Sequence, residues 1–365
     1  MDYPDALTGV EAQGIGANII LMDGGPDVLR RRKKTKLWIW IGIWIAALLM
    51  ISVVLPGIIV NKGGGWQEAI QLTPKEELHM NDNSITVPVY MTAQKEIVEL
   101  PLEQYVRGVV AAEMPAEFEL EALKAQAIAA RTYIIRRMER SDFSNVPVEG
   151  AWVTDSVQHQ AFMTEEQMKD RWGWFGFASR LDKLTQAVNE TEGLIVTYEG
   201  EPIQATFFST SNGYTENSED YWGNVIPYLR SVPSPWDTQI SPKYKQTFEL
   251  PSEDVRDKLG LPSTVPVSFS EESFKSASYT KGKRIKEITI EGKTFSGREV
   301  REKLGLPSSQ FTWELREGMV HITTFGYGHG VGMSQYGAQG MALSGKKADD
   351  ILTYYYQGVQ IEKFY

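Results

Sequence analysis

The sequence predicts an α+β fold preceded by a single transmembrane helix. Three observations lead to this prediction. An apolar run without charged residues, 37–60, follows a cluster of basic residues. Alternating apolar residues at 85–89, with a second β-type run at 97–100, indicate strands, and apolar residues recur at helical spacing from 102 to 134. Segments of both kinds succeed one another along the rest of the chain, as is typical of a mixed fold.

The N-terminal apolar run is long enough to cross a bilayer, because at ~1.5 Å per residue it can span a hydrocarbon core of ~30 Å. Six basic residues lie directly before it: Arg30, Arg31, Arg32, Lys33, Lys34 and Lys36. The positive-inside rule then places the N-terminus in the cytoplasm and the chain after the run outside. A cleaved signal peptide is the alternative, but the length of the run and the lack of a small-residue cleavage site favour an anchor. We therefore expect a cytoplasmic tail at 1–36, a transmembrane helix at 37–60, a linker at 61–84 and an extracytoplasmic domain at 85–365.

Composition excludes several classes of function. The 365 residues carry a formal net charge of -10, which argues against a nucleic-acid partner, since such binding needs a basic face. The chain has no cysteine, so no disulfide, thiolate nucleophile or Cys-containing zinc site is possible. The spacing of His79, His159, His321 and His329 does not match a metal site, and His159 near Asp155 is an unsupported option. The Gly-x-Ser-x-Gly motif that would indicate a serine hydrolase is absent from the sequence. We expect no metal and no other cofactor.

The first helix of the predicted domain ends at a glutamate. Pro101 suits the first turn of a helix, and Pro115 disfavours helical geometry at Met114, so this helix should end near Glu113. The carboxyl end of a helix carries partial negative charge, which raises the pKa of a carboxyl group there, as burial also does. A carboxyl group that stays protonated near neutral pH can protonate a glycosidic oxygen. The structural alternative is a solvated helix end.

An alanine-rich helix is predicted to begin around Glu119. Lys124 and Arg131 lie seven residues apart and therefore on one face of this helix. They could orient Glu113 or bind substrate, although such residues more often form a solvated stripe. The aromatic segment 171–177 is predicted to be a loop, either packed against the domain or forming the lip of a binding site.

A polar loop at 210–223 is predicted to follow two strands that lie within 194–209 around a Glu-Gly turn. Short hydroxyl and amide side chains next to aromatic rings suit a sugar, because they can bond to its edge while a ring covers its face. The candidates in and before this loop are Ser209, Thr210, Ser211, Asn212 and Tyr214. An ordinary Asn-Gly turn is the alternative.

Near the C-terminus, the glycine-rich segment "GYGHGVGMSQYG" lacks the Gly-Lys-Ser/Thr ending of a phosphate loop. Its glycines allow the backbone to approach a ligand closely, so His329, Gln335 and Tyr336 are candidates for the wall of a cleft. A helix capped near Ser334 and a last helix through Ile351 and Tyr355 should follow.

Two short helices that end in Gly are also predicted, at 254–263 and 299–308, with a strand and a turn at 284–292 between them.

Four stretches, taken together and in this order, resemble the stage II sporulation protein D family. They are "LEQYVRGVVAAEMPAEFELEALKAQAIAARTY", "FFSTSNGYTENSEDYWGNVIPYLRSVPSPWD", "GREVREKLGLPSSQFTWEL" and "GHGVGMSQYGAQGMA". The resemblance covers roughly residues 85 to 363, and the predicted membrane anchor fits it as well.

The resemblance implies a mixed α/β body with a long substrate cleft and a peptidoglycan lytic transglycosylase activity. The substrate would be glycan strands stripped of stem peptides, during engulfment in endospore-forming bacteria. Glu113, in the pattern "AAEMP", would be the catalytic acid and base. The implied partners are stage II sporulation protein P, an amidase, and stage II sporulation protein M, a membrane scaffold. The implied location is the cell membrane on the mother-cell side of the sporulation septum.

The chain departs from the family at two places. Some relatives bind zinc through Cys and His near the segment that matches 154–162, but this chain has no Cys, so no metal is carried over. Some relatives have His-Tyr-Tyr where this chain has three tyrosines at 354–356.

Two other functions remain open at the level of sequence. One is a non-catalytic glycan-binding module that recruits or activates the amidase. The other is a hydrolase with two catalytic carboxyl groups, of which Asp155, Glu117 or Glu216 would be the second.

Overall fold

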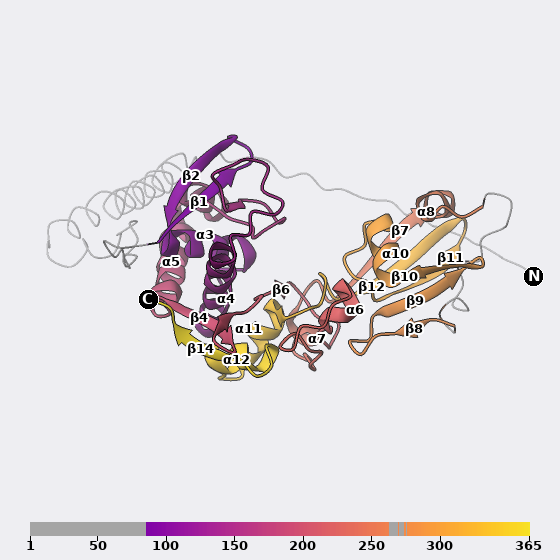
Figure 1. The fold of residues 1–365 in the computed structure, drawn as a ribbon. Helices are drawn as coiled ribbons and strands as arrows, with labels where there is room; N and C mark the ends of the chain where they lie inside the picture. The colour runs from indigo at the N-terminus through magenta and orange to yellow at the C-terminus, as the bar shows by residue number, and fades with distance from the viewer. Residues whose placement is uncertain (1–84, 263–268, 270–273, 275) are drawn as a thin grey trace, which may run out of the picture. The chain divides into compact units, whose positions relative to one another are not determined.

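The computed structural model describes residues 85–262, 269, 274 and 276–365, all within one compact unit of the chain, Gln71–Tyr365 (Figure 1). The predicted cytoplasmic tail, transmembrane helix and linker lie outside the described residues and stay predictions. Within the described part, no helix combines the length and apolar character needed to span a membrane. Nine helices and several small sheets of two or three strands make this part a mixed α+β fold, as the sequence predicts.

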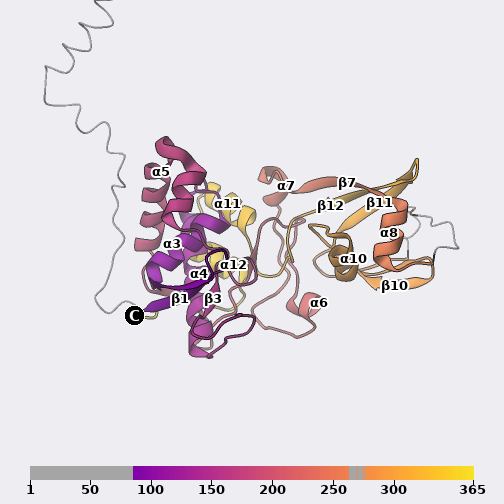
Figure 2. The same cartoon turned by 90° about the horizontal axis from the view of Figure 1, so that it is seen from above.

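Three helices form the centre of a first hydrophobic core. They are α3 (Leu102–Glu113), α4 (Leu120–Glu139) and α5 (Glu165–Asn189), and they pack against one another (Figures 1 and 2). Alanines on α4, including Ala125 and Ala129, are fully buried, and their small side chains allow the helices to approach closely. As predicted, α3 ends at Glu113, because Met114 takes an extended conformation before Pro115.

A small sheet packs against α3. The strands β1 (Thr86–Met91) and β2 (Glu96–Pro101) form an antiparallel hairpin, and β3 (Val153–Thr154) pairs in parallel with β1. The two predicted strands are thereby confirmed. The alternation in β1 follows from the two faces of a strand, since Val87, Val89 and Met91 are buried while Thr86, Pro88 and Tyr90 are exposed or half-buried.

The aromatic segment 171–177 is not a loop, and in this respect the prediction was wrong. It lies inside α5, which begins with a capping box formed by Thr164 and Gln167. Gly173 interrupts the helix with a φ of 67°, a left-handed value that glycine adopts readily, and two helical pieces meet there at a kink. The kink breaks the helical period of the apolar residues, which explains why the pattern does not predict one helix.

Further elements complete the first core. They are β4 (Leu194–Tyr198), β5 (Glu201–Pro202), β6 (Phe207–Phe208), α6 (Ser218–Trp222), α7 (Asp237–Ile240), β13 (Met333–Ser334), α11 (Gln335–Leu343), α12 (Ala348–Tyr355) and β14 (Gln360–Lys363). The strands pair as β14–β4–β5 and β13–β6. The Glu199–Gly200 turn, the cap at Ser334 and the last helix all agree with the sequence prediction.

A second hydrophobic core is built from two three-stranded sheets and two short helices. Its elements are β7 (Lys245–Pro251), α8 (Ser252–Leu259), β8 (Ser278–Tyr279), β9 (Ile285–Ile290), β10 (Lys293–Ser296), α10 (Gly297–Leu304), β11 (Phe311–Arg316) and β12 (Met319–Phe325). The strand orders are β11–β12–β7 and β10–β9–β8. The helices α8 and α10 end at Gly260 and Gly305 in the left-handed conformation, which confirms the predicted caps.

Candidate active site

The carboxyl group of Glu113 faces a cleft of about 460 Å³. The cleft runs along the end of α3 and the turn that follows it, and residues of α5 and of the segment before β7 complete its walls. Its lining residues are Ala111, Ala112, Glu113, Met114, Pro115, Ala116, Glu117, Arg171, Trp172, Arg180 and Lys243. Two carboxyl groups and three cations therefore meet around one cavity.

Two hydrogen bonds hold the Glu113 carboxylate on its protein side. The backbone N–H of Ala161 donates to Oε1 at 2.9 Å, and the side chain of Gln335 also hydrogen-bonds to the carboxyl group. Burial raises the pKa of Glu113, and these two bonds oppose the rise without cancelling it. The direction is the one expected from the sequence, and burial is its largest cause.

The loop that contains Ala161 packs closely against α3 because a glycine, Gly108, stands at the contact. A Cβ atom on Gly108 would lie 2.1 Å from Cε2 of Phe162, so only glycine leaves room for this ring. The backbone N–H of Met163 donates to the Gly108 carbonyl at 3.1 Å, and Phe162 stacks on Tyr105 with ring centroids 5.8 Å apart. The absent side chain at Gly108 thus determines where the donor to Glu113 lies.

Glu117, the second carboxyl group of the cleft, has a different environment. Arg180 donates to it through Nε at 2.8 Å, and Nη2 lies 2.7 Å from the same oxygen. Slight burial raises the pKa of Glu117, but the hydrogen bond from Arg180 and the charges of Arg180 and Lys183 lower it overall. The pKa values of the two glutamates are therefore shifted in opposite directions, upward for Glu113 and downward for Glu117.

The predicted cleft-wall residues take three different positions. Gln335 is buried and contacts Glu113, so it positions the carboxyl group. Tyr336 is half-buried and packs edge-to-face on Phe118, with ring centroids 5.0 Å apart. His329 lies instead in a cluster of aromatic rings formed by Phe208, Tyr221 and Trp222.

Burial, together with the charges of Arg301 and Arg284, lowers the pKa of His329 to about 4. The imidazole is therefore neutral at physiological pH. Its Nδ1 accepts the backbone N–H of Val331 at 3.1 Å. His329 is thus used within the fold and is not among the residues that line the cleft.

Lys124 and Arg131 share a helical face, as predicted, but the structure gives them partners other than Glu113. Arg131 is fully buried and donates to both oxygens of Glu103, at 2.8 and 2.5 Å. Lys124 pairs with Glu121 at 3.1 Å and with Glu190. Neither residue lines the cleft, and the interpretation as a solvated stripe does not describe the buried Arg131.

The polar residues at 209–214 are organised around a buried aspartate, Asp237, which the sequence analysis missed. Its carboxyl group accepts the backbone N–H of Ser211 at 2.7 Å and the hydroxyl of Ser234 at 2.6 Å, and Ser334 also donates to it. Burial raises the pKa of Asp237, and the hydrogen bonds from Ser234, Ser334 and Ser211 oppose this rise without cancelling it. Because Ser334 caps α11, this network ties the loop to the helix that carries Gln335.

The other sequence candidates of this loop have contacts of their own. Ser209 accepts the Tyr336 N–H through its carbonyl at 3.1 Å, and Thr210 is buried, with its hydroxyl 2.7 Å from that of Ser241. Asn212 is also buried, and its amide donates to the carbonyl of Gly282 at 2.8 Å. Tyr214 is exposed. None of them lines the cleft at Glu113.

Two carboxyl groups considered from the sequence as a second catalytic group lie elsewhere. Asp155 accepts the backbone N–H of Thr92 at 3.1 Å. Glu216 is buried, accepts the hydroxyl of Thr280 at 2.7 Å and lies 3.9 Å from Nη1 of Arg284. Glu117 is thus the candidate that shares a cleft with Glu113.

His159 uses both ring nitrogens within the fold. Its Nδ1 accepts the Thr154 N–H at 3.2 Å, and its Nε2 lies 3.1 Å from the carbonyl oxygen of Ser144. Burial lowers the pKa of His159. In the described part of the chain, no group of three or more His, Cys, Asp or Glu side chains could hold a metal ion.

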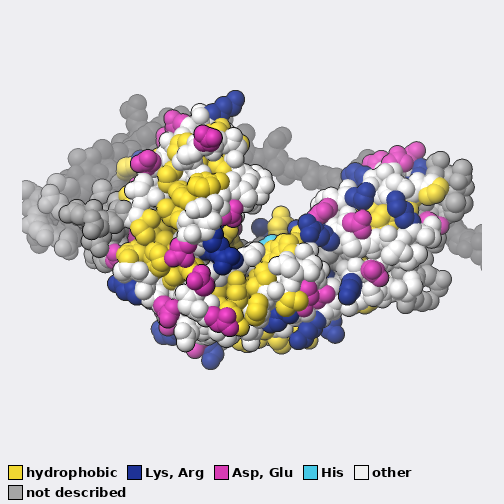
Figure 3. Space-filling view, in the orientation of Figure 1, with side chains coloured by type: hydrophobic (Ala, Val, Ile, Leu, Met, Phe, Trp, Pro, Cys, Tyr) yellow, Lys and Arg dark blue, Asp and Glu magenta, His cyan; other side chains and the backbone are white. Residues whose placement is uncertain are grey.

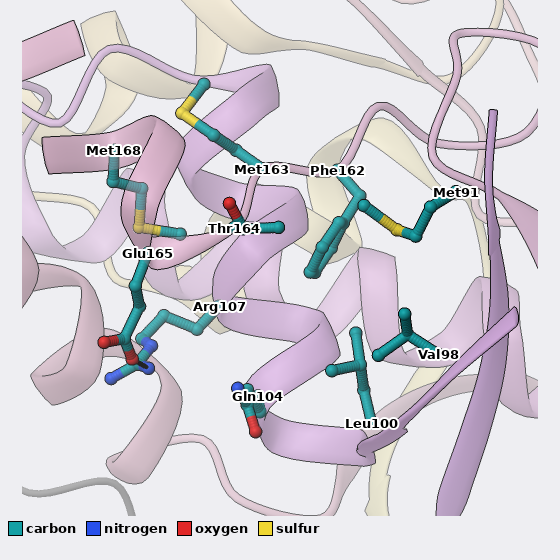
Figure 4. Close-up of a pocket in the computed structure, with 10 residues that line it drawn as sticks. All are labelled: Met91, Val98, Leu100, Gln104, Arg107, Phe162, Met163, Thr164, Glu165 and Met168. Carbon is teal, nitrogen blue, oxygen red and sulfur yellow. Dashed lines mark hydrogen bonds and ion pairs between the residues drawn. The ribbon is translucent and has the colours of Figure 1, made fainter. Parts of the chain in front are cut away.

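A second cavity, of about 250 Å³, lies on the other side of Phe162 (Figure 4). Met91, Val98 and Leu100 lie beside the Phe162 ring (Figure 4). In the view of Figure 3, hydrophobic side chains gather on the part of the surface where Figure 1 shows α5 and the β1–β2 hairpin. Of the ten residues that line the cavity, Glu165 alone carries a carboxyl group, which pairs with Arg107. This cavity therefore offers no free acid or base, and the cleft at Glu113 is the better candidate.

Comparison with known proteins identifies the family. The family model described as "Stage II sporulation protein" matches residues 90–198, which include α3, Glu113 and the loop with Ala161. Stage II sporulation protein D of Bacillus subtilis (strain 168) is 48% identical over 279 residues, which are 76% of this chain and 79% of that protein. The chain belongs to the stage II sporulation protein D family.

Other members and relatives agree with this assignment. Stage II sporulation protein D of Bacillus amyloliquefaciens is 46% identical over 332 residues, covering 88% of this chain and 94% of that protein. A more distant relative, named amidase enhancer in Bacillus subtilis (strain 168), is 29% identical over 312 residues, 71% of this chain but 40% of that protein. The chain is thus a sporulation protein of this family.

Proposed function

We propose that this sporulation protein is a peptidoglycan lytic transglycosylase that cleaves the bond between N-acetylmuramic acid and N-acetylglucosamine in strands stripped of stem peptides. One observation carries the proposal. Glu113 faces an open cleft, its pKa is raised by burial, and donors on its protein side orient it. A protonated and oriented carboxyl group beside a cleft is what the protonation of a glycosidic oxygen requires.

In the proposed reaction, Glu113 donates its proton to the glycosidic oxygen, and the bond from that oxygen to C1 of muramic acid breaks. The N-acetyl group of the same sugar stabilises the oxocarbenium-like centre. The Glu113 carboxylate then takes the proton of the C6 hydroxyl, whose oxygen bonds to C1 and closes a 1,6-anhydro ring. One C–O bond breaks and one forms, no water is consumed, and the carboxyl group ends protonated as it began.

A hydrolase with two carboxyl groups is disfavoured by the state of Glu117. An inverting hydrolase needs a free carboxylate to activate water, and a retaining one needs it as a nucleophile. The carboxylate of Glu117 is ionised, but one of its oxygens receives both contacts from Arg180. Held in this way, Glu117 is a poor base and a poor nucleophile, and a mechanism with one carboxyl group fits better.

The biological setting is part of the proposal. The protein would be anchored by residues 37–60 with its domain outside the cytoplasm, on the mother-cell side of the septum. It would remodel the septal wall during engulfment together with the amidase and the membrane scaffold named above. A second candidate function, a glycan-binding module that activates an amidase, is favoured by the relative whose name is amidase enhancer.

The products of the reaction decide among these functions. The full chain is incubated with amidase-stripped glycan strands in water enriched in ¹⁸O, and the products are analysed by mass spectrometry. We expect anhydro-muramic ends without ¹⁸O. Reducing ends that carry ¹⁸O would establish hydrolysis instead, and intact strands, with amidase present as well, would support the binding module.

A further inference from the structure

The cleft at Glu113 is more basic than the protein that contains it. The chain has a formal net charge of -10, and acidic side chains are spread over the face shown in Figure 3. Even so, Arg171, Arg180 and Lys243 all line this one cavity. Arg180 is paired with Glu117, so the excess positive charge comes from Arg171 and Lys243.

Arg171 lines the cleft from the first helical piece of α5, next to the kink. It lies two residues before Gly173, whose positive φ separates the first helical piece from the second. Trp172 lines the cleft beside it. Gly173 has open space around it, so it is the left-handed backbone conformation that favours glycine there. Arg171 and Trp172 therefore stand at the end of the first helical piece, directly before the kink.

Lys243 comes from a different part of the chain, between α7 and β7. Its Nζ atom lies 4.8 Å from the centre of the Tyr327 ring. Among the described residues, no carboxylate lies within ion-pair distance of Lys243 or of Arg171. Two cations that face a cleft without an anionic partner are suited to bind an anionic ligand.

The proposed substrate carries such an anion at a defined place. When an amidase removes the stem peptide, the lactyl group of N-acetylmuramic acid keeps a free carboxylate. In an intact strand the same carbon is part of a neutral amide bond. We propose that Arg171 and Lys243 bind lactyl carboxylates, so that the cleft selects glycan strands from which the stem peptides have been removed. This inference rests on the proposed function, because it assumes that the cleft holds glycan.

The test compares two strands that differ at the lactyl group, which is an anionic carboxylate in one strand and a neutral amide in the other. Amidase-stripped strands are used as they are, or after their lactyl carboxyl groups have been converted to neutral N-methylamides. Affinity is measured with the full chain carrying Glu113→Gln, so that cleavage does not interfere. The double variant Arg171→Gln, Lys243→Gln is compared with a charge-matched control, Arg140→Gln, Lys346→Gln, at two exposed residues that do not line the cleft.

We expect the Glu113→Gln protein to bind the charged strand roughly 2- to 30-fold more tightly than the methylamide strand, as two exposed ion pairs allow. Adding Arg171→Gln and Lys243→Gln should abolish this preference, and the control pair should keep it. Raised salt should reduce the preference, because the groups are exposed.

A preference that survives in the double variant would overturn the inference, as would equal binding of both strands or binding of neither. The fate of the proposed function is read separately. If the wild-type protein cleaved neither strand but the preference and its loss were observed, the transglycosylase proposal would fall while the carboxylate site stood.

Discussion

Half-buried Glu113 and buried Glu216 are both glutamates that accept hydrogen bonds, but Glu113 lines a cleft whereas Glu216 is enclosed by a cation and its donors. Burial raises the pKa of both carboxyl groups. Glu216 is enclosed, with Thr280 and the Gly282 N–H as donors and the guanidinium of Arg284 3.9 Å away, and these neighbours lower its pKa in part. Glu113 has two donors on one side and a cleft on the other, and among the described residues no cation forms an ion pair with it.

The comparison teaches that a raised pKa does not by itself identify a catalytic acid. The described residues pack tightly around Glu216, since a Cβ atom on Gly282 would lie 2.6 Å from its Oε1 atom. The cleft allows a ligand to approach the carboxyl group of Glu113 and accept its proton. Burial supplies the same electrostatic effect at both sites, and access decides which one can do chemistry.

The largest effect is expected from Glu113→Gln. The amide has the shape of the acid but no transferable proton, so strand cleavage should fall by about 10²- to 10⁴-fold. Initial rates of anhydro-muramic product formation, with circular dichroism to check the fold, measure this. The matched change Glu117→Gln, in the same cleft, should cost less than about tenfold. Equal losses in the two variants would instead support a mechanism with two catalytic carboxyl groups.

The enclosed site should respond in stability instead. Arg284→Met leaves Glu216 without its cation and should lower the free energy of unfolding by roughly 3–5 kcal/mol. Removing the cation raises the folded-state pKa of Glu216 further. Below the unfolded-state pKa of Glu216, its carboxyl group is protonated in both states, so this part of the stability is fully present. It is lost as the pH rises through the folded-state pKa of Glu216, because the buried carboxyl group must then ionise without its cation. Urea unfolding at pH 5 and pH 8 should therefore show the larger loss at pH 8.

A control for this prediction is Arg298→Met, which breaks the exposed pair between Arg298 and Glu302. Solvent screens that pair, so the loss should stay below about 1 kcal/mol. Equal losses for Arg284→Met and Arg298→Met would show that enclosure does not matter, and the comparison between the two sites would fail.

A smaller effect should appear in the pH dependence of cleavage. Glu113 must be protonated to act, so the rate should hold below its raised pKa and fall about tenfold per pH unit well above it. The amide of Gln335 stabilises the carboxylate, so Gln335→Ala should raise the pKa of Glu113 and move the alkaline limb to higher pH. Gln339→Ala, on the same helix, should leave the limb in place. A limb that moves to lower pH in Gln335→Ala would contradict this assignment.

Several features of the fold and site follow from residues that are neighbours in the sequence. Pro115 ends α3 at Glu113 because the residue before a proline avoids helical geometry. Gly260 and Gly305 end α8 and α10 because they adopt the left-handed conformation without a side-chain clash. These effects act over one turn of chain, and local pattern is sufficient to predict them.

The capping box at Thr164 and Gln167 was a local signal as well, and it could have revealed the start of α5. The rest of the helix was not predicted because α5 is kinked at Gly173. The apolar residues before and after the kink therefore do not follow one continuous helical spacing.

The sequence by itself determined the α+β class, the family resemblance and the place of Glu113 at a helix end. Tertiary structure alone decided that Glu113 accepts hydrogen bonds from the N–H of Ala161 and the amide of Gln335. It also decided that Arg131 forms an ion pair with Glu103, and that the N–H of Ser211 in the loop at 209–214 donates to Asp237. The physical reason is range. Propensity and capping act between neighbours, whereas burial, ion pairing and pKa depend on which distant segments pack together, as when Gly108 admits Phe162.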